Sequence, residues 1–503
     1  MKKSILFGSI LTALLMTPST HAQTVAEDVP RHPDIPTLDE ILADYDKGKL
    51  TLDELRVMGL SVFAVPFNNR DGLGDGPFDP AEHAIDPIAF GHRPTLQGNG
   101  TFLRVNGLDA QSCNECHTVE SNRTNPPTLG TGGIGGAVQN AIIMSTLIDV
   151  ADSSDDRVHY EPGHDPDLPL VADGEADFTG RFSNPPFLYG GGGVELLAKE
   201  MTADLQALLA QAPNDPIGTV TSLDTHGVNF GTITTLYGGG VQIDAVGVNE
   251  DLVVRPFGRK GENFSMRDFD RGAMQFHFGI QPEEVVGAGV DEDGDLVADE
   301  VTVAEMSMLH IFDVTNARPF IDRQTTETEL GFQRFTEVGC SGCHMPVMQT
   351  YSKLLPLAHP EVPTDPAANV YLSIDLTKDV GTNGSGVFGS NRHGGVDVPL
   401  FSDLKRHPMG TRLAETFERG ELLQDEFVTA RLWGIADTGP YLHDGRATTL
   451  YQAIEYHGGE AQSVRDAFLA LPETDQSALI RFLLTLKTPV GANAELVSKL
   501  LKQ

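Results

Sequence analysis

The chain has 503 residues, of which 71 are acidic and 35 are basic, so its formal net charge at pH 7 is −36. A surface this acidic disfavours binding to nucleic acid and anionic membranes and favours partners with a basic contact face, although the same charge would also serve solubility in a saline setting. An apolar fraction of 40% is compatible with a globular chain, and the length exceeds one ordinary domain. We therefore expect at least two hydrophobic cores.

Residues 1–22 have the three-part layout of a secretory signal peptide. Two lysines precede an apolar stretch that ends at Met16, and small and polar residues follow up to Ala22. The apolar stretch is shorter than the roughly 20 residues that a transmembrane helix needs, and no later segment is long and apolar enough to span a bilayer. We therefore expect cleavage near Ala22 and a periplasmic or secreted protein without a membrane span.

Two five-residue motifs contain every cysteine of the chain. They read Cys113-Asn-Glu-Cys116-His117 and Cys340-Ser-Gly-Cys343-His344. C-x-x-C-H is the signature of c-type haem attachment, in which both thiols bind the haem covalently and the histidine is the proximal ligand of the iron. A thioredoxin-like redox pair or a split zinc site would not need a histidine directly after the second cysteine. The sequence predicts two covalently bound haem c groups, with His117 and His344 as iron ligands.

An acidic loop at residues 291–300 lies between the two motifs. Alternate carboxylates in a glycine-containing loop are typical of the oxygen ligands of Ca²⁺. Leu296 stands where an EF-hand has glycine, and Thr302 stands where it has glutamate, so the loop is not a regular EF-hand. A calcium site is one interpretation and a solvated acidic turn is the other. The candidate calcium ligands are Asp291, Asp293, Asp295 and Asp299.

The haem motifs also divide the chain into predicted domains. Residues 23–60 form an N-terminal leader, 61–325 a first haem lobe that includes the acidic loop, and 326–503 a second haem lobe. Apolar residues recur at near-helical spacing before the second motif and again from residue 475 to 487. These helices predict a mainly α protein, and 53 glycines and 31 prolines predict long loops that pack against the haems.

Several blocks of sequence match a known pattern. The most specific reads LWGIADTGPYLHDGRATTL from Leu432, followed by HGGEA from His457. Others are FNNRDGLG from Phe67, NPPFLYGGGGVELLAKEM from Asn184, FGRKG from Phe257, the acidic loop, and LKRHPMG from Leu404. In these blocks the chain resembles the bacterial di-haem cytochrome c peroxidase superfamily, and more closely its branch called di-haem oxidoreductases, often labelled as peroxidases or thiol oxidoreductases.

The resemblance implies a fold and an activity. The fold would be two cytochrome c-like lobes with long loops, each built around one covalent haem. The first haem would react with hydrogen peroxide or another small oxidant, and the second would pass electrons to it. A small redox protein or another electron donor would supply those electrons, and many relatives form homodimers.

The resemblance also implies candidate catalytic residues. Glu195 and Glu200 lie in a block similar to the family's distal segment, where an acid–base group moves a proton between the two peroxide oxygens. The sequence does not separate the two glutamates, and either could instead be a solvent-facing residue of a helix.

Met409 is the candidate sixth ligand of the second haem. It lies where related proteins often supply that ligand, and a thioether ligand raises the reduction potential. The family pattern tends to read His-Asp-Met, whereas this chain has His-Pro-Met. The alternative ligands are His407, His443 and His457, and packing in the core is the other role open to Met409.

Two further functions are compatible with the same two haems. A di-haem electron carrier without peroxidase activity needs only two closed haems. An oxygenase-like enzyme is the other alternative, since related di-haem proteins oxidise protein side chains or cleave polyisoprene with O₂. The long loops after Cys116 and the two glutamates favour the peroxidase.

Overall fold

The computed structural model describes residues 32, 35–74, 110–119, 142–147, 178–183, 185–292, 295–381, 386–415 and 423–502. The predicted signal peptide and its cleavage position near Ala22 lie outside these residues, and so does Asp293 of the acidic loop. No helix within the described ranges combines the length and the apolar character needed to cross a membrane.

The fold is mixed, and the prediction of a mainly α protein made of two cytochrome c-like lobes is wrong. The strands of the described segments form six small antiparallel sheets, none with more than three strands. Their bounds are β1 (Ile142–Leu147), β2 (Phe178–Ser183), β3 (Val220–Thr225), β4 (Val228–Thr235), β5 (Val241–Ala245), β6 (Phe320–Ile321), β7 (Met348–Gln349), β8 (Leu354–Ala358), β9 (Val370–Asp375), β10 (Gly389–Ser390), β11 (Val396–Val398), β12 (Arg406–Pro408), β13 (Glu426–Val428) and β14 (Leu486–Lys487).

The β3–β4 hairpin shows why the prediction failed. β4 alternates buried and exposed residues along much of its length, as expected for a strand with one face on a core. His226 and Gly227 join the two strands with φ values of +46° and +83°, which is the two-residue turn that suits a right-twisted hairpin. We interpreted such glycine-containing segments as loops around haem, whereas this one is a turn between short strands.

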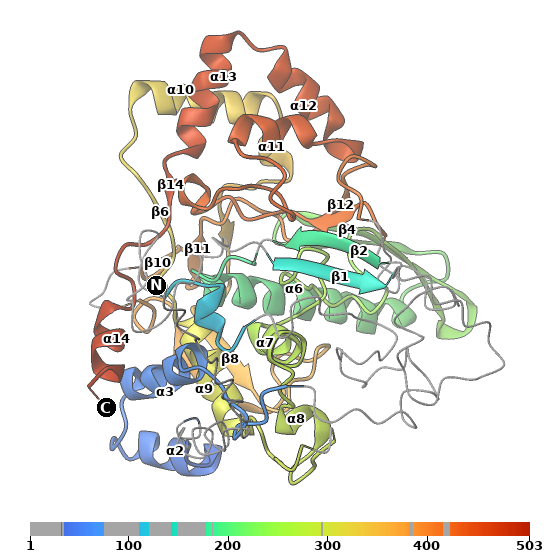
Figure 1. The fold of residues 1–503 in the computed structure, drawn as a ribbon. Coiled ribbons are helices and arrows are strands. Elements are labelled where there is room, and N and C mark those ends of the chain that lie inside the picture. The colour runs from blue at the N-terminus through green and yellow to red at the C-terminus, as the bar shows by residue number, and fades with distance from the viewer. Residues whose placement is uncertain are drawn as a thin grey trace, which may run out of the picture.

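The long helix α6 (Gly191–Gln211) crosses the middle of the molecule (Figure 1). It packs against α9 (Val303–Val314), which also contacts α3 (Leu52–Ala64) and α7 (Met266–Ala273). The glycine run at the start of α6 permits this approach. A Cβ on Gly192 would lie only 2.3 Å from the main-chain oxygen of Val314.

A separate apolar cluster lies at the top of the molecule in Figure 1. Its helices are α10 (Thr326–Glu337), α11 (Leu450–Tyr456), α12 (Gln462–Leu469) and α13 (Glu473–Leu483). α10 packs on α13, and the rings of Phe335, Phe401 and Phe482 contact one another at its centre. This cluster lies next to the second cysteine motif, because Cys340 packs against it.

The end of the chain returns to the N-terminal helices. α14 (Ala494–Leu500) lies beside α3, and Lys499 pairs with Asp53 at 2.6 Å (Figure 1). The remaining helices are α2 (Leu38–Asp46) and α8 (Glu283–Val286). α3 crosses the predicted boundary at residue 60, and the predicted domain division as a whole stays a prediction.

Gly59 of α3 provides a test of the packing between α3 and α9. A Cβ at this position would lie 2.0 Å from the main-chain oxygen of Met308 and 2.6 Å from Cβ of Phe312. We expect Gly59→Ala to lower the free energy of unfolding by about 1–3 kcal/mol, measured by chemical denaturation. Gly272→Ala in α7 is the matched control, because nothing lies within 4 Å of its Cβ. Equal stability of the two variants would contradict the close approach.

Candidate functional site

The two cysteine motifs adopt the same local conformation. Each begins with a short 3₁₀ turn, η1 (Cys113–Glu115) in the first motif and η6 (Cys340–Gly342) in the second. The main-chain N–H of His117 donates to the oxygen of Cys113 at 2.9 Å, and that of His344 donates to Cys340 at 3.0 Å. All four thiols are free of disulfide bonds. Each turn therefore holds two thiols and one imidazole close together, which fits the donor set of a covalently attached haem.

His117 lies in an apolar environment beside Phe63, whose ring centre is 6.3 Å away. Its Nδ1 atom is buried and has no hydrogen-bond partner among the described residues. Burial, and secondarily the nearby His277, lowers the pKa of His117 to about 3. The imidazole is therefore neutral, which is the form that binds a metal.

His344 is oriented by a hydrogen bond. Its Nδ1 lies 3.1 Å from the main-chain oxygen of Phe401 and must donate to it, since a carbonyl oxygen only accepts. This leaves Nε2 with a free lone pair, in the arrangement usual for metal-binding histidines. Burial, and then His457, lowers the pKa of His344 to about 4, so this imidazole is also neutral.

Glu195 is fully buried on the side of α6 that faces α7 and α9. Its carboxylate lies 2.7 Å from Nζ of Lys199 and 3.1 Å from Nε2 of His310, and it accepts the main-chain N–H of Met266 at 2.9 Å. Burial by itself would raise the pKa of Glu195, but Lys199 and His310 lower it below its ordinary value. The buried side chain is therefore an ionised carboxylate with its partners in place.

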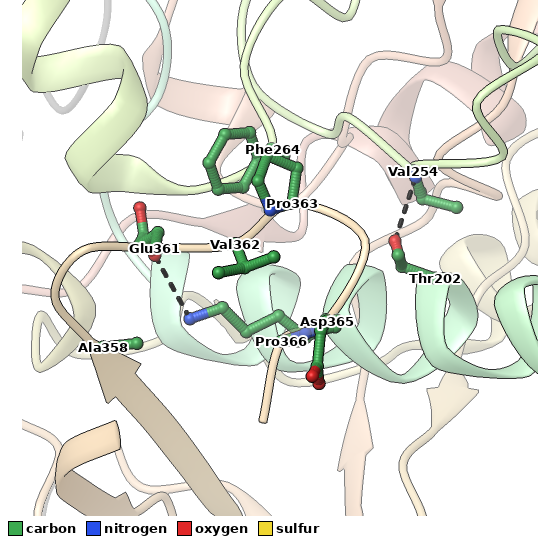
Figure 2. Close-up of a pocket in the computed structure, with 10 residues that line it drawn as sticks. Thr202, Val254, Phe264, Ala358, Glu361, Val362, Pro363, Asp365 and Pro366 are labelled. Atoms are coloured by element: carbon green, nitrogen blue, oxygen red, sulfur yellow. Dashed lines mark hydrogen bonds and ion pairs between the residues drawn. The ribbon is translucent and has the colours of Figure 1, made fainter. Parts of the chain in front are cut away.

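Lys199 also lines a pocket, together with Glu361 and Val362. Its ammonium also donates to the main-chain oxygen of Pro356 at 2.7 Å and lies 3.5 Å from Glu361. Figure 2 shows the loop that carries Glu361, Val362 and Pro363 crossing α6 at this point. The cluster thus connects a buried carboxylate to this pocket.

Two buried aspartates interact with both Glu195 and Cys113. Asp270 of α7 and Asp313 of α9 are hydrogen-bonded to each other, and burial raises the pKa of both well above the ordinary value. The charge of Glu195 acts in the same direction on both. The same aspartates, after burial itself, raise the pKa of Cys113. Glu195 and Cys113 therefore share these two aspartates as buried acidic neighbours.

Glu200 lies on a different side of α6. It accepts the main-chain N–H groups of Tyr351 and Ser352 at 2.7 and 2.8 Å, and Nε2 of His226 lies 3.5 Å away. Burial raises the pKa of Glu200 above its ordinary value. These partners come from the β3–β4 turn and from the segment after the second motif, so the structure separates the two glutamates that the sequence left together.

The cluster around Glu195 was only partly visible in the sequence. Lys199 stands four residues after Glu195, where a helix brings side chains together, and this spacing could have been noticed. His310 and Glu361 complete the cluster. They lie 115 and 166 positions further along the chain, and the sequence carries no local signal that joins them to Glu195.

Met409 and His407, two candidate sixth ligands for a haem at the second motif, lie just after the end of β12 and within it. The N–H of Met409 donates to the oxygen of Asp425 at 2.7 Å, and its role as a ligand stays a prediction. His407 lies between Asp403 and Glu460, with one ring nitrogen 2.9 Å from the first and the other 3.0 Å from the second. With both nitrogens occupied, His407 is a poor iron ligand.

Three carboxylates of the acidic loop accept hydrogen bonds from main-chain N–H groups in or next to the loop. Asp291, Asp295 and Asp299 accept the N–H groups of Leu296, Val297 and Gly289 at 3.0, 2.8 and 2.6 Å. These hydrogen bonds shape the turn and are compatible with either interpretation of the loop. Calcium binding stays a prediction.

Comparison with known proteins supports the resemblance seen in the sequence. Residues 376–486 match the family described as "Di-haem oxidoreductase, putative peroxidase". A "Cytochrome-c peroxidase IdrP2" of Pseudomonas sp. (strain SCT) is 29% identical over 166 residues, which is 32% of this chain and 40% of that relative. The match thus spans less than half of the relative's length. The predicted resemblance to the di-haem peroxidase-like superfamily is confirmed, and that family uses haem.

Lys199 provides a test of the buried cluster. Replacing it by methionine leaves Glu195 buried without its ammonium partner, and we expect Lys199→Met to lower the free energy of unfolding by about 3–5 kcal/mol. Lys353→Met is the matched control, since Lys353 pairs with Asp375 at the same distance of 2.7 Å but is 46% exposed. Its loss should cost less than about 1 kcal/mol in the same chemical denaturation experiment.

The effect of Lys199→Met should also depend on pH. The folded pKa of Glu195 is lowered, so its contribution to stability is complete above the unfolded value of about 4.3 and is lost as the pH falls through the folded value. In the variant the lowering effect of Lys199 is lost and burial raises the pKa of Glu195, so its carboxylate takes up a proton first as the pH falls and the unpaired charge disappears. The difference between wild type and variant should therefore shrink between neutral pH and about pH 3. A difference that stays constant would contradict an ionised Glu195.

Proposed function

We propose that the protein is an exported di-haem c-type oxidoreductase that reduces hydrogen peroxide with electrons passed from the second haem to the first. The observation that carries the proposal is the ionised, buried Glu195, which shares the buried neighbours Asp270 and Asp313 with Cys113. The resemblance of residues 376–486 to a family described by two haems and peroxidase activity supports it. A haem held by Cys113, Cys116 and His117 would supply the iron at which peroxide is reduced.

Glu195 is the acid–base group in this proposal. An ionised carboxylate accepts a proton from one peroxide oxygen and returns it to the other, which assists heterolytic cleavage of the O–O bond. Lys199 and His310 hold the carboxylate in one orientation. Reduction of one peroxide to two waters consumes two electrons and two protons, and an external donor supplies the electrons through the second haem.

The second motif has the complementary role. Cys340, Cys343 and His344 hold the haem that receives electrons from the donor. The net charge of −36 favours a small redox protein with a basic contact face as that donor. We also propose a homodimer, from the resemblance, and a calcium site at the acidic loop, from its alternating carboxylates Asp291, Asp293, Asp295 and Asp299.

Substitution of the two glutamates tests the proposed role of Glu195. We expect Glu195→Gln to slow peroxide reduction by about 10²- to 10⁴-fold in steady-state assays with a reduced donor, because the amide cannot accept the proton. Glu200→Gln should change the rate far less, since Glu200 binds backbone N–H groups on another side of α6. Covalent haem content should be the same in both variants. Equal rate losses in the two variants would contradict the assignment.

Wild-type protein with two bound haems but no turnover of peroxide would overturn the proposed activity itself. The alternatives then differ in their reaction with O₂. A stable ferrous complex with O₂ would favour the oxygenase-like function. Two irons that bind neither peroxide nor O₂ would favour the electron carrier.

The number of covalently bound haems is a separate prediction. Intact-mass measurement of the denatured protein should show two haems on the wild type and one on the Cys340→Ala/Cys343→Ala variant. The variant should also lose peroxide reduction by the external donor, because electrons no longer reach the first haem. Two haems retained on the double variant would contradict covalent attachment at the second motif.

A further inference from the structure

We propose that His457 is the sixth ligand of the iron at the second motif, so that this haem is held between two histidines, His344 and His457. The ring centres of these two residues lie 6.4 Å apart. The inference rests on the haem attachment in the proposed function and goes beyond it, since it assigns the second axial ligand to a residue 113 positions after the first.

The distance between the two rings matches ligation of one metal ion from opposite sides. An imidazole nitrogen lies about 2 Å from a first-row metal, so two imidazoles on opposite sides have their nitrogens about 4 Å apart and their ring centres about 6 Å apart. The planes of the two rings are inclined by 54°. Axial imidazoles can turn about the line that joins them through the metal, so such an inclination is compatible with joint ligation.

The hydrogen bonds of the two rings follow the same pattern. Nδ1 of His457 lies 2.8 Å from the main-chain oxygen of Ala453, as Nδ1 of His344 lies 3.1 Å from that of Phe401. A carbonyl oxygen only accepts, so Nδ1 carries the hydrogen in both rings and Nε2 keeps its lone pair. A metal-binding histidine usually has this arrangement, because the hydrogen bond fixes both the tautomer and the direction of the ring.

The backbone around His457 is held on both sides. Its N–H donates to Ile454 at the end of α11, and its oxygen accepts a hydrogen bond from Arg465 at 2.9 Å. The next residues, Gly458 and Gly459, pack directly on the strand end that carries Met409. A Cβ on Gly459 would lie 2.2 Å from the oxygen of Pro408. His457 therefore projects from a fixed segment, as a ligand that must not move during electron transfer should.

The other candidate ligands are less suitable. Both nitrogens of His407 are occupied by carboxylates. His443 stacks on Phe427 with ring centres 4.7 Å apart. Met409 is the main rival, because its main-chain oxygen approaches Gly458 directly. The experiment must therefore separate His457 from Met409.

Ligation by two histidines has consequences for the second haem. Its reduction potential should be lower than that of a haem with one histidine and one methionine. Its iron would be closed to peroxide by two protein ligands. Both properties suit a haem that passes electrons to the reactive haem at the first motif.

Spectroscopy of the haem-loaded full-length chain tests the inference. Electron paramagnetic resonance and near-infrared magnetic circular dichroism of the wild type should show a low-spin haem with two histidine ligands. Met409→Leu, a volume-conserving control, should leave these spectra unchanged. His457→Ala should convert one of the two haems to high spin without loss of covalent haem, and added imidazole should restore the low-spin signal.

A second variant keeps the test decisive if His457→Ala fails to fold. His457→Met should replace the two-histidine signal by the sulfur-to-iron charge-transfer band of a methionine ligand. A sulfur band in the wild type that Met409→Leu removes would overturn the inference in favour of Met409. The outcome is independent of turnover. Two-histidine ligation without peroxide reduction would overturn only the proposed function, and peroxide reduction with a methionine-ligated haem would overturn only the ligand.

Discussion

A buried negative charge constrains the centre of this protein. Removing a carboxylate from water costs several kcal/mol unless cations and hydrogen bonds compensate it, and Glu195 is fully buried. Its compensation comes from three helices, with Lys199 from α6 itself, Met266 N–H from α7 and His310 from α9. These contacts therefore fix α6, α7 and α9 relative to one another. The close contact at Gly192 on the same helix leaves little freedom for α6 to shift.

The same helix relates the two cysteine motifs. Glu195 connects through Asp270 and Asp313 to the surroundings of Cys113. Five residues later, Glu200 binds the segment that follows the second motif. Five residues correspond to well over a full turn of helix, so the two carboxylates point to different sides. One helix thus carries a carboxylate that binds α7 and α9 and another that binds the segment after the second motif.

The sequence predicted features that lie within one short segment, and it missed contacts between residues that are far apart along the chain. The C-x-x-C-H motifs specify their own chemistry, and the structure gives both the same turn. The sequence also placed Glu195 and Glu200 in the block similar to the family's distal segment but could not rank them, because their partners come from α7, α9 and the loop after the second motif.

The mainly α prediction failed because strand pairing, too, depends on residues from different segments. Strands such as β4 are defined by pairing with their neighbours, and their glycines resemble those of loops. The contact between Lys499 and Asp53 joins opposite ends of the chain and has no local signature.

Any difference between the two proposed haem sites must come from the surroundings of each histidine, since the motifs themselves share one pattern. Nδ1 of His344 is tied to the main chain, and a second imidazole with the same tautomer faces it at a distance suited to one shared metal ion. His117 instead has a buried Nδ1 without a hydrogen-bond partner among the described residues, and the aspartates Asp270 and Asp313 act on Cys113 of the same motif. Two protein ligands favour a closed iron with a stable coordination shell. Buried groups that hold or exchange protons favour chemistry on a substrate that must be protonated. The proposed division between an electron-transfer centre and a reactive centre therefore rests on the different surroundings of two motifs that share one pattern.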